Sequence, residues 1–270
     1  MNKLGMGIAA AAISFALTGC GGAQSSWETE EVAVASDRLM ADSVEAAWSV
    51  DGEAGEDASI RLQLATKEGT PVEAFDLNHE KLLHLIVVSK DLSYFNHIHP
   101  EYRGEGVFEI SNVFPAGGAY RLIADFKPTD GDAMTKLTWA EVGGAPAASE
   151  AVVPDESLNK IVAGKRVALA AEGLVAGEEA TLTFSLADEA TGEPISDLEP
   201  YLGAIGHVVV LSEEGERYVH VHAEADQGTG PEAKFETTFP KAGIYKIWGQ
   251  FQHRGEVFTA SYVVNVEKRS

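Results

Sequence analysis

Residues 84–101 read His84-Leu-Ile-Val-Val-Ser-Lys-Asp-Leu-Ser-Tyr-Phe-Asn-His97-Ile-His99-Pro-Glu101. The apolar, β-branched run Leu82–Ser89 predicts a strand, and the polar pair Lys90-Asp91 predicts a turn into a second strand. Because side chains alternate between the faces of a sheet, the later histidines and the glutamate share one face. A two-residue hairpin loop then puts His84 opposite His97, with Cβ atoms about 5 Å apart. The stretch therefore predicts three imidazoles and a carboxylate on one face of a β-hairpin.

The same spacing, His-x12-His-x-His-x-Glu, returns in the second half of the chain. Most of the residues between differ, but the apolar run Val208–Leu211 again predicts a strand before a polar break. Crowded imidazoles repel one another when protonated, and neutral rings leave donors and acceptors that need partners. A divalent cation resolves this problem by taking one nitrogen from each ring. We therefore predict two metal sites, one of His84, His97, His99 and Glu101 and one of His207, His220, His222 and Glu224.

Two other functional interpretations of these histidines remain open. A lone histidine on a strand more often has ordinary hydrogen-bond partners than a metal, and on that interpretation the protein is an adhesion or scaffold module. Three histidines with an open coordination position also occur at catalytic zinc, which would indicate a metal-dependent hydrolase. No nucleophile or general base is recognisable in the sequence. Repetition of the whole four-residue pattern favours metal binding without catalysis.

The ligand types narrow the choice of metal. Imidazole and carboxylate suit Cu(II), Zn(II) or Ni(II), and Cu(II) binds most tightly in the Irving–Williams order. The single cysteine is Cys20, and neither Met40 nor Met134 is near a histidine in the sequence, which argues against blue copper and against a methionine-rich Cu(I) site. We expect Cu(II), with Zn(II) as the alternative. Since the ligands must be neutral, occupancy is expected to fall as the pH drops through about 6.

The first 19 residues have the features of a secretory signal peptide. Lys3 precedes the apolar run Ile8–Leu17, which is too short for a stable membrane span. The sequence Leu17-Thr-Gly-Cys20 resembles the bacterial lipobox, and this resemblance implies cleavage before Cys20 and lipidation of its thiol. The alternatives are an ordinary signal peptide with an incidental cysteine, or an uncleaved anchor. We expect a lipid-anchored protein on the extracytoplasmic face of a bacterial membrane, with the bilayer and a metal transporter or other envelope protein as partners.

The charge of the chain is strongly acidic. Asp and Glu number 42 against 20 Lys and Arg, so the formal net charge is −22, and it becomes −23 once Lys3 leaves with the signal peptide. Such a surface disfavours nucleic acid and anionic lipid and raises the local concentration of cations. Solubility in the cell envelope is a simpler reason for the same charge.

The remaining pattern is all-β. We predict two tandem antiparallel sandwiches, at residues 44–142 and 160–267, after a tether at residues 20–43 and with a linker at residues 143–159. Residues 37–47 are compatible with a helical turn or with the approach to the first strand. The predicted strands are Ser59–Thr66, Leu82–Ser89, Tyr94–His99, Val107–Phe114, Ala119–Phe126 and Lys136–Val142, then Arg166–Ala171, Ala180–Ala187, Gly206–Leu211, Tyr218–His222, Ala233–Phe239, Gly243–Phe251 and Val257–Val266.

A second repeated motif supports the duplication. Phe114–Phe126 and Phe239–Phe251 share Phe, Pro, Gly, Tyr and Phe at identical offsets. The glycines are expected to supply a φ that other residues resist, and the tyrosines to anchor a corner of each sandwich. His79 and His253 have no histidine counterpart in the other repeat and are expected in surface turns. An alternative for His79 is that, with Glu80, it adds a ligand to the first site.

The histidine stretch, Phe114-Pro-Ala-Gly-Gly and Tyr201-Leu-Gly-Ala-Ile-Gly-His207 together resemble a poorly characterised group of bacterial secreted proteins and lipoproteins. Members have tandem immunoglobulin-like or cupredoxin-like sandwiches and lie near the YtkA-like proteins. The resemblance covers about residues 44–266, and it implies a role in copper or heavy-metal handling. One departure is Ala223 in the place of Pro100, which leaves every predicted ligand present.

Overall fold

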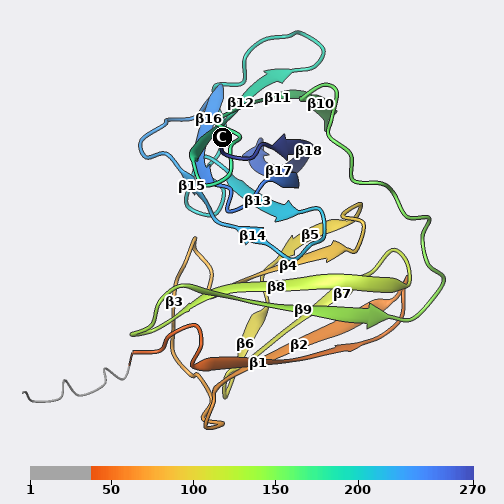
Figure 1. Cartoon of the computed structure of the whole chain (residues 1–270), viewed down its shortest axis with the longest axis vertical. Coiled ribbons are helices and arrows are strands. Elements are labelled where there is room, and N and C mark those ends of the chain that lie inside the picture. Colours follow the sequence, from red (N-terminus) through yellow and green to blue (C-terminus); the bar gives the residue numbers. More distant parts are fainter. Residues whose placement is uncertain (1–37) are drawn as a thin grey trace, which may run out of the picture. The chain divides into compact units, whose positions relative to one another are not determined.

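The computed structural model describes residues 38–270, and strands are the only regular elements in this part of the chain (Figure 1). The predicted signal peptide, Cys20 and most of the tether lie outside the described residues. The first repeat contains β1 (Val44–Asp51), β2 (Asp57–Thr66), β3 (Phe75–Asp76), β4 (Leu83–Ser89), β5 (Phe95–Ile98), β6 (Glu101–Gly104), β7 (Val107–Val113), β8 (Gly118–Pro128) and β9 (Met134–Val142). The second contains β10 (Asn159–Val162), β11 (Lys165–Glu172), β12 (Glu179–Asp188), β13 (His207–Ser212), β14 (Tyr218–Val219), β15 (Val221–Ala223), β16 (Glu232–Thr238), β17 (Gly243–His253) and β18 (Glu256–Val266).

Each repeat is a pair of antiparallel sheets around its own apolar core. In the first repeat, β1-β2-β7-β6 faces a sheet ordered β3-β8-β4-β5, with β9 also paired to β8. In the second repeat, β10-β11-β12-β16-β15 faces β14-β13-β17-β18. The predicted fold class, two tandem antiparallel β-sandwiches, is therefore confirmed.

Strands β4 and β13 are apolar on both faces because each lies between two cores. Leu83, Leu85 and Val87 of β4 pack inside the first sandwich. Ile86 and Val88 point the other way, into a third cluster with Val209, Leu211 and Trp248 of the second repeat. Since a strand covered on both sides needs apolar residues at every position, the unbroken apolar runs in the sequence follow from this packing. Residues 38–270 accordingly form one compact unit.

The tyrosine corners predicted from the second motif are present in both repeats. The Tyr120 hydroxyl donates to the carbonyl of Ala116 at 2.7 Å, and the Tyr245 hydroxyl donates to the carbonyl of Lys241 at 2.8 Å. Gly118 and Gly243 have φ values of +132° and +146°, which residues with a Cβ rarely adopt. These side chains are scaffold, and they fix the angle at which β8 and β17 begin.

Residues 44–47 belong to β1, so of the two interpretations of the segment before the first sandwich, the structure shows the approach to the first strand. The linker is held at several points. Val152 packs against the third cluster, and Asp155 exchanges hydrogen bonds with the backbone of Val263. No helix of the described residues is long and apolar enough to cross a membrane.

Candidate metal centre

The β4–β5 hairpin has a different register from the predicted one. Leu85 pairs with Ile98 and Val88 with Phe95, so the loop covers four residues centred one position later than expected. Asp91 holds this loop by accepting hydrogen bonds from Ser89 Oγ and from the backbone and hydroxyl of Ser93. Continuing the register puts His84 opposite His99, two residues from the expected partner. Because a shift of two preserves the alternation of faces, the histidines still share one face.

The three histidines of the first hairpin come together. Ligand atoms of His84, His97 and His99 lie within 4.8 Å of one another. Nδ1 of His84 and Nε2 of His97 are 3.0 Å apart. The outer nitrogens have other partners: His84 Nε2–H donates to the carbonyl of Asn78 at 2.8 Å, and His97 Nδ1–H donates to Oε1 of Gln250 at 2.7 Å. In this arrangement both inner nitrogens carry lone pairs that point toward each other.

Burial keeps these rings neutral. It lowers the pKa of His84 and that of His99 to about 4, and it lowers the pKa of His97 well below the ordinary value of 6.5. Nε2 of His99 is buried and, among the described residues, has no hydrogen-bond partner. A proton is therefore a poor occupant of the space between the rings at neutral pH, and a divalent cation is a chemically suitable one.

His207 of the second repeat lies beside the same three rings. Its ring centroid is 4.8 Å from that of His97 and 5.7 Å from that of His84, and its plane is 9° from that of His84. Burial and then the neighbouring His84 lower the pKa of His207 to about 3. The repeated spacing predicted a separate site for His207, because nothing in the spacing indicates that the two repeats pack through equivalent faces.

Two further polar residues of the site were missed by sequence analysis. Gln250 on β17 pairs in register with His207, and Asp125, at the equivalent position of the first repeat, pairs with His84. Asp125 is 5% exposed, its Oδ1 has no partner among the described residues, and burial raises its pKa to about 6. The sequence contained one signal for these two residues: each is a polar residue directly before the last Phe of the second repeated motif.

The second set of predicted ligands is not brought together. His207 lies in the β14-β13-β17-β18 sheet, but the chain leaves this sheet after Val219, and His222 pairs with Glu236 in the opposite sheet. The Thr237 hydroxyl donates to the carbonyl of His220 at 2.6 Å and fixes this crossing point. In the first repeat, β5 continues to Ile98, which is two residues beyond the position equivalent to Val219. His220 and His222 are consequently exposed.

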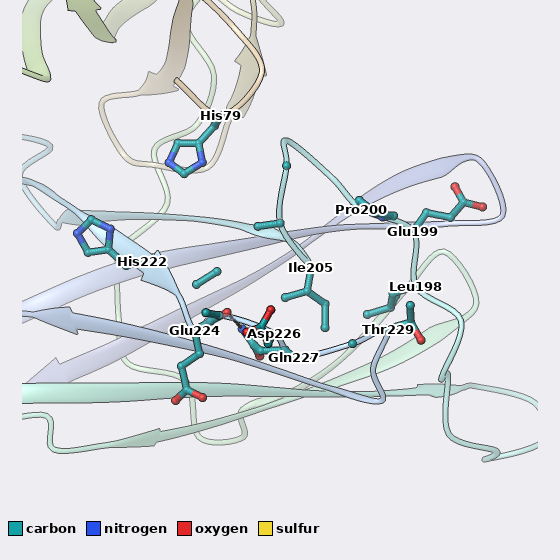
Figure 2. A pocket seen from close by; sticks show the side chains of 15 residues that line it. His79, Leu198, Glu199, Pro200, Ile205, His222, Glu224, Asp226, Gln227 and Thr229 are labelled. Carbon is teal, nitrogen blue, oxygen red and sulfur yellow. Dashed lines mark hydrogen bonds between the residues drawn. The ribbon is translucent and has the colours of Figure 1, made fainter. Parts of the chain in front are cut away.

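Neither predicted glutamate joins the histidines. Glu101 begins β6 in the other sheet of its sandwich, is 71% exposed and forms an ion pair with Arg103 at 2.7 Å. The Glu224 side chain lines a pocket and points away from His222 (Figure 2). The carboxylate nearest in register to the histidines is therefore Asp125.

That pocket, of about 440 Å³, lies next to the histidine group. His79 and His222 are both in its wall (Figure 2), and the ring centroid of His79 is 5.6 Å from that of His207. None of His84, His97 and His99 lines the pocket. His79 is in an exposed turn as predicted, with a φ of +46°. The prediction for His253 is wrong: this residue ends β17, is buried, and its Nε2 lies 3.0 Å from Oδ1 of Asp197.

Known structures with a similar fold are distant in sequence. Invasin, a bacterial integrin-binding protein, is 14% identical with a TM-score of 0.28, and the match covers 84% of this chain and 39% of invasin. Domains 4 and 5 of the S-layer protein SbsC are 13% identical with a TM-score of 0.24, covering 83% and 97% of the two chains. The D00-D0 domain of intimin is 12% identical with a TM-score of 0.24, covering 82% and 98%.

No curated protein matches the chain. A family model does match, at residues 39–144 and again at residues 160–268, so the internal repeat is supported by an independent finding. The resemblance seen in the sequence implied a role in copper or heavy-metal handling. None of these matches connects the chain with such a role. The chain belongs to the family described as Domain of unknown function (DUF8832), of which it contains two copies.

Proposed function

We propose that the protein binds a divalent transition-metal cation through His84, His97 and His99, for sequestration or delivery. The observation that carries this proposal is the convergence of two inner nitrogens at 3.0 Å beside the buried, unpartnered Nε2 of His99. The hydrogen bonds on the outer nitrogens support it, because metal-binding histidines usually donate their other N–H to a carbonyl or a similar acceptor.

The ligand types favour Cu(II). Imidazole nitrogens suit both Cu(II) and Zn(II), and Cu(II) binds more tightly in the Irving–Williams order.

A scaffold or adhesion module is the second candidate. In this case the histidines are structural, and hydrogen bonds between the same residues replace the metal. If the Gln250 amide is turned over, it donates to His97 Nδ1, His97 Nε2–H donates to His84 Nδ1, and His84 Nε2–H donates to Asn78. This chain satisfies both rings without a metal. It does not satisfy Nε2 of His99, and it gives no reason for the close approach of His207. We therefore favour cation binding.

The proposed role is non-catalytic. The 440 Å³ pocket does not include any of the three histidines, so it does not provide a substrate cleft at their open coordination positions. We further propose that the protein is lipid-anchored through Cys20 on the extracytoplasmic face of a membrane. A transporter or other envelope protein would then receive or supply the cation. Mass spectrometry of the purified protein tests the anchor through the mass of lipid on Cys20.

Titration of the full-length chain in detergent with Cu(II) and with Zn(II) tests the binding. His97→Ala should lower the affinity by more than about 100-fold, because loss of a ligand costs more than loss of an outer-shell partner. The matched control is His220→Ala, which removes the equivalent histidine of the second repeat and should leave the affinity unchanged. His97→Gln serves if the alanine variant fails to fold by circular dichroism. Equal affinities in wild type and both His97 variants would overturn the proposal.

A further inference from the structure

The two repeats meet at the histidine group through polar contacts as well as apolar ones. Gln250 of β17 accepts a hydrogen bond from His97 of β5 and pairs in register with His207 of β13. On one side, this polar contact adjoins the apolar cluster in which Phe95 stacks on Trp248, with centroids 4.8 Å apart and planes 15° apart. His207 is therefore held against the first repeat by the packing of both sheets.

Within residues 38–270, no hydrogen bond fixes the His207 ring. The hydrogen bonds of residues 38–270 include none to its ring nitrogens, although the residue is only partly exposed. Its nearest ring neighbours are His97 at 4.8 Å, His79 at 5.6 Å and His84 at 5.7 Å. Stacking neutral imidazoles without partners brings little stability, because each ring has polar nitrogens to satisfy.

A pocket of about 440 Å³ lies near this ring. His79 lines the pocket, and its ring centroid is 5.6 Å from that of His207. Figure 2 shows His79 and His222 at one end of this pocket, with acidic side chains such as Asp226 and Glu199 elsewhere around it. Such an acidic lining raises the local concentration of cations beside the histidine group.

We infer that His207 is the fourth ligand of the cation held by His84, His97 and His99, so that one ion joins the two repeats. This inference rests on the proposed function and extends it. The duplicated motif then provides one shared site per chain, with three ligands from the first repeat and one from the second. The His207 ring lies just outside the group of three and closes onto the ion when it binds. Cation binding consequently stabilises the contact between the repeats.

The inference is tested on the full-length chain with Cu(II), comparing His207→Ala with His222→Ala. Both substitutions remove a histidine of the same motif copy, but only the first residue touches the group. X-ray absorption should show four imidazole ligands in wild type and in His222→Ala, and three in His207→Ala. The affinity should fall about 10- to 100-fold in His207→Ala alone.

Different failures have different meanings. Three imidazoles and an unchanged affinity in both wild type and His207→Ala would overturn the shared site while leaving the proposed function in place. Failure of His97→Ala to weaken binding would overturn the proposed function itself. His207→Gln replaces the alanine variant if the latter unfolds, since its amide retains the size and polarity of the ring but is a poor ligand for Cu(II).

Discussion

The two histidine hairpins begin from the same spacing and have the same register. Leu85 pairs with Ile98 and Val210 with Val219, so in each repeat the first histidine of the motif lies opposite the third by continuation. In the first repeat the second strand stays in its sheet long enough to keep its histidines beside His84. In the second repeat the strand crosses to the other sheet earlier, held by Thr237, and its histidines face solvent.

The difference shows that ligand spacing and ligand position are separate properties. Spacing sets which side chains share a face while a strand remains in one sheet. The residue at which the strand changes sheets decides how many of those side chains reach the site. That residue depends on a contact with a distant strand, and the spacing alone does not contain it.

The largest effect is expected in the acid stability of the metal-free protein. The folded-state pKa of His84, about 4, is below the unfolded value of 6.5, so the unfolded state binds more protons between these pH values. Stability is therefore fully present above pH 6.5 and falls as the pH drops toward 4, by on the order of 3 kcal/mol for His84 alone. Asp125 acts oppositely, because its pKa is raised to about 6, and it offsets about one histidine.

With two buried and two partly buried histidines (His84, His97, His99 and His207) against one carboxylate, the net loss should be several kcal/mol, measured by urea unfolding at pH 7, 5.5 and 4.5. The variant His222→Ala should reproduce the wild-type profile. A wild-type profile that is flat over this range, or one that His222→Ala flattens, would contradict the contrast between the hairpins. The lowered pKa values also move proton competition with the metal from the expected pH 6 toward pH 4.

A second effect concerns the equivalent positions Asp125 and Gln250. Asp125→Asn should stabilise the metal-free protein by up to about 3 kcal/mol at pH 7, because it removes a buried charge whose Oδ1 has no partner. The exposed Asp51→Asn is the control and should change stability by less than about 0.5 kcal/mol. Chemical denaturation measures both. A loss of stability in Asp125→Asn would show that the carboxylate has a stabilising partner.

The smallest effect is expected at Gln250. Gln250→Glu places a group that can only accept beside His97 Nδ1, so His97 must present the lone pair of Nε2 to the metal. The Cu(II) affinity should rise about tenfold, which corresponds to about 1.4 kcal/mol. Gln63→Glu on β2, in the other sheet of the first repeat, is the control for added charge. Reduced affinity in Gln250→Glu would favour the hydrogen-bonded chain of the scaffold alternative.

Much of the fold could be predicted because it is encoded locally. Alternation in Ser59–Thr66, the unbroken run Leu82–Ser89 and the Pro-Gly corners each determine an element through a few neighbouring residues. The hairpin register was displaced by two residues because the loop that Asp91 closes is centred one position later than the polar pair Lys90-Asp91, and such a pair does not determine the centre of a loop.

The composition of the candidate site could be predicted only in part. His84, His97 and His99 share one hairpin, so their grouping is a local property. His207 and Gln250 reach the site through the packing of one repeat on the other, which depends on which faces carry Ile86, Val209 and Trp248. Asp125 reaches it through the pairing of β8 with β4, which the sequence does not specify. Nothing in the spacing of the second motif distinguishes an apolar run buried inside one sandwich from one buried between two.

The number of Cu(II) ions bound per full-length chain tests this account most directly. Native mass spectrometry together with elemental analysis of metal-loaded protein should give one ion per chain, held by the first hairpin and His207. Two ions per chain would mean that each motif copy forms its own site, and none would mean that the histidines only hold the repeats together.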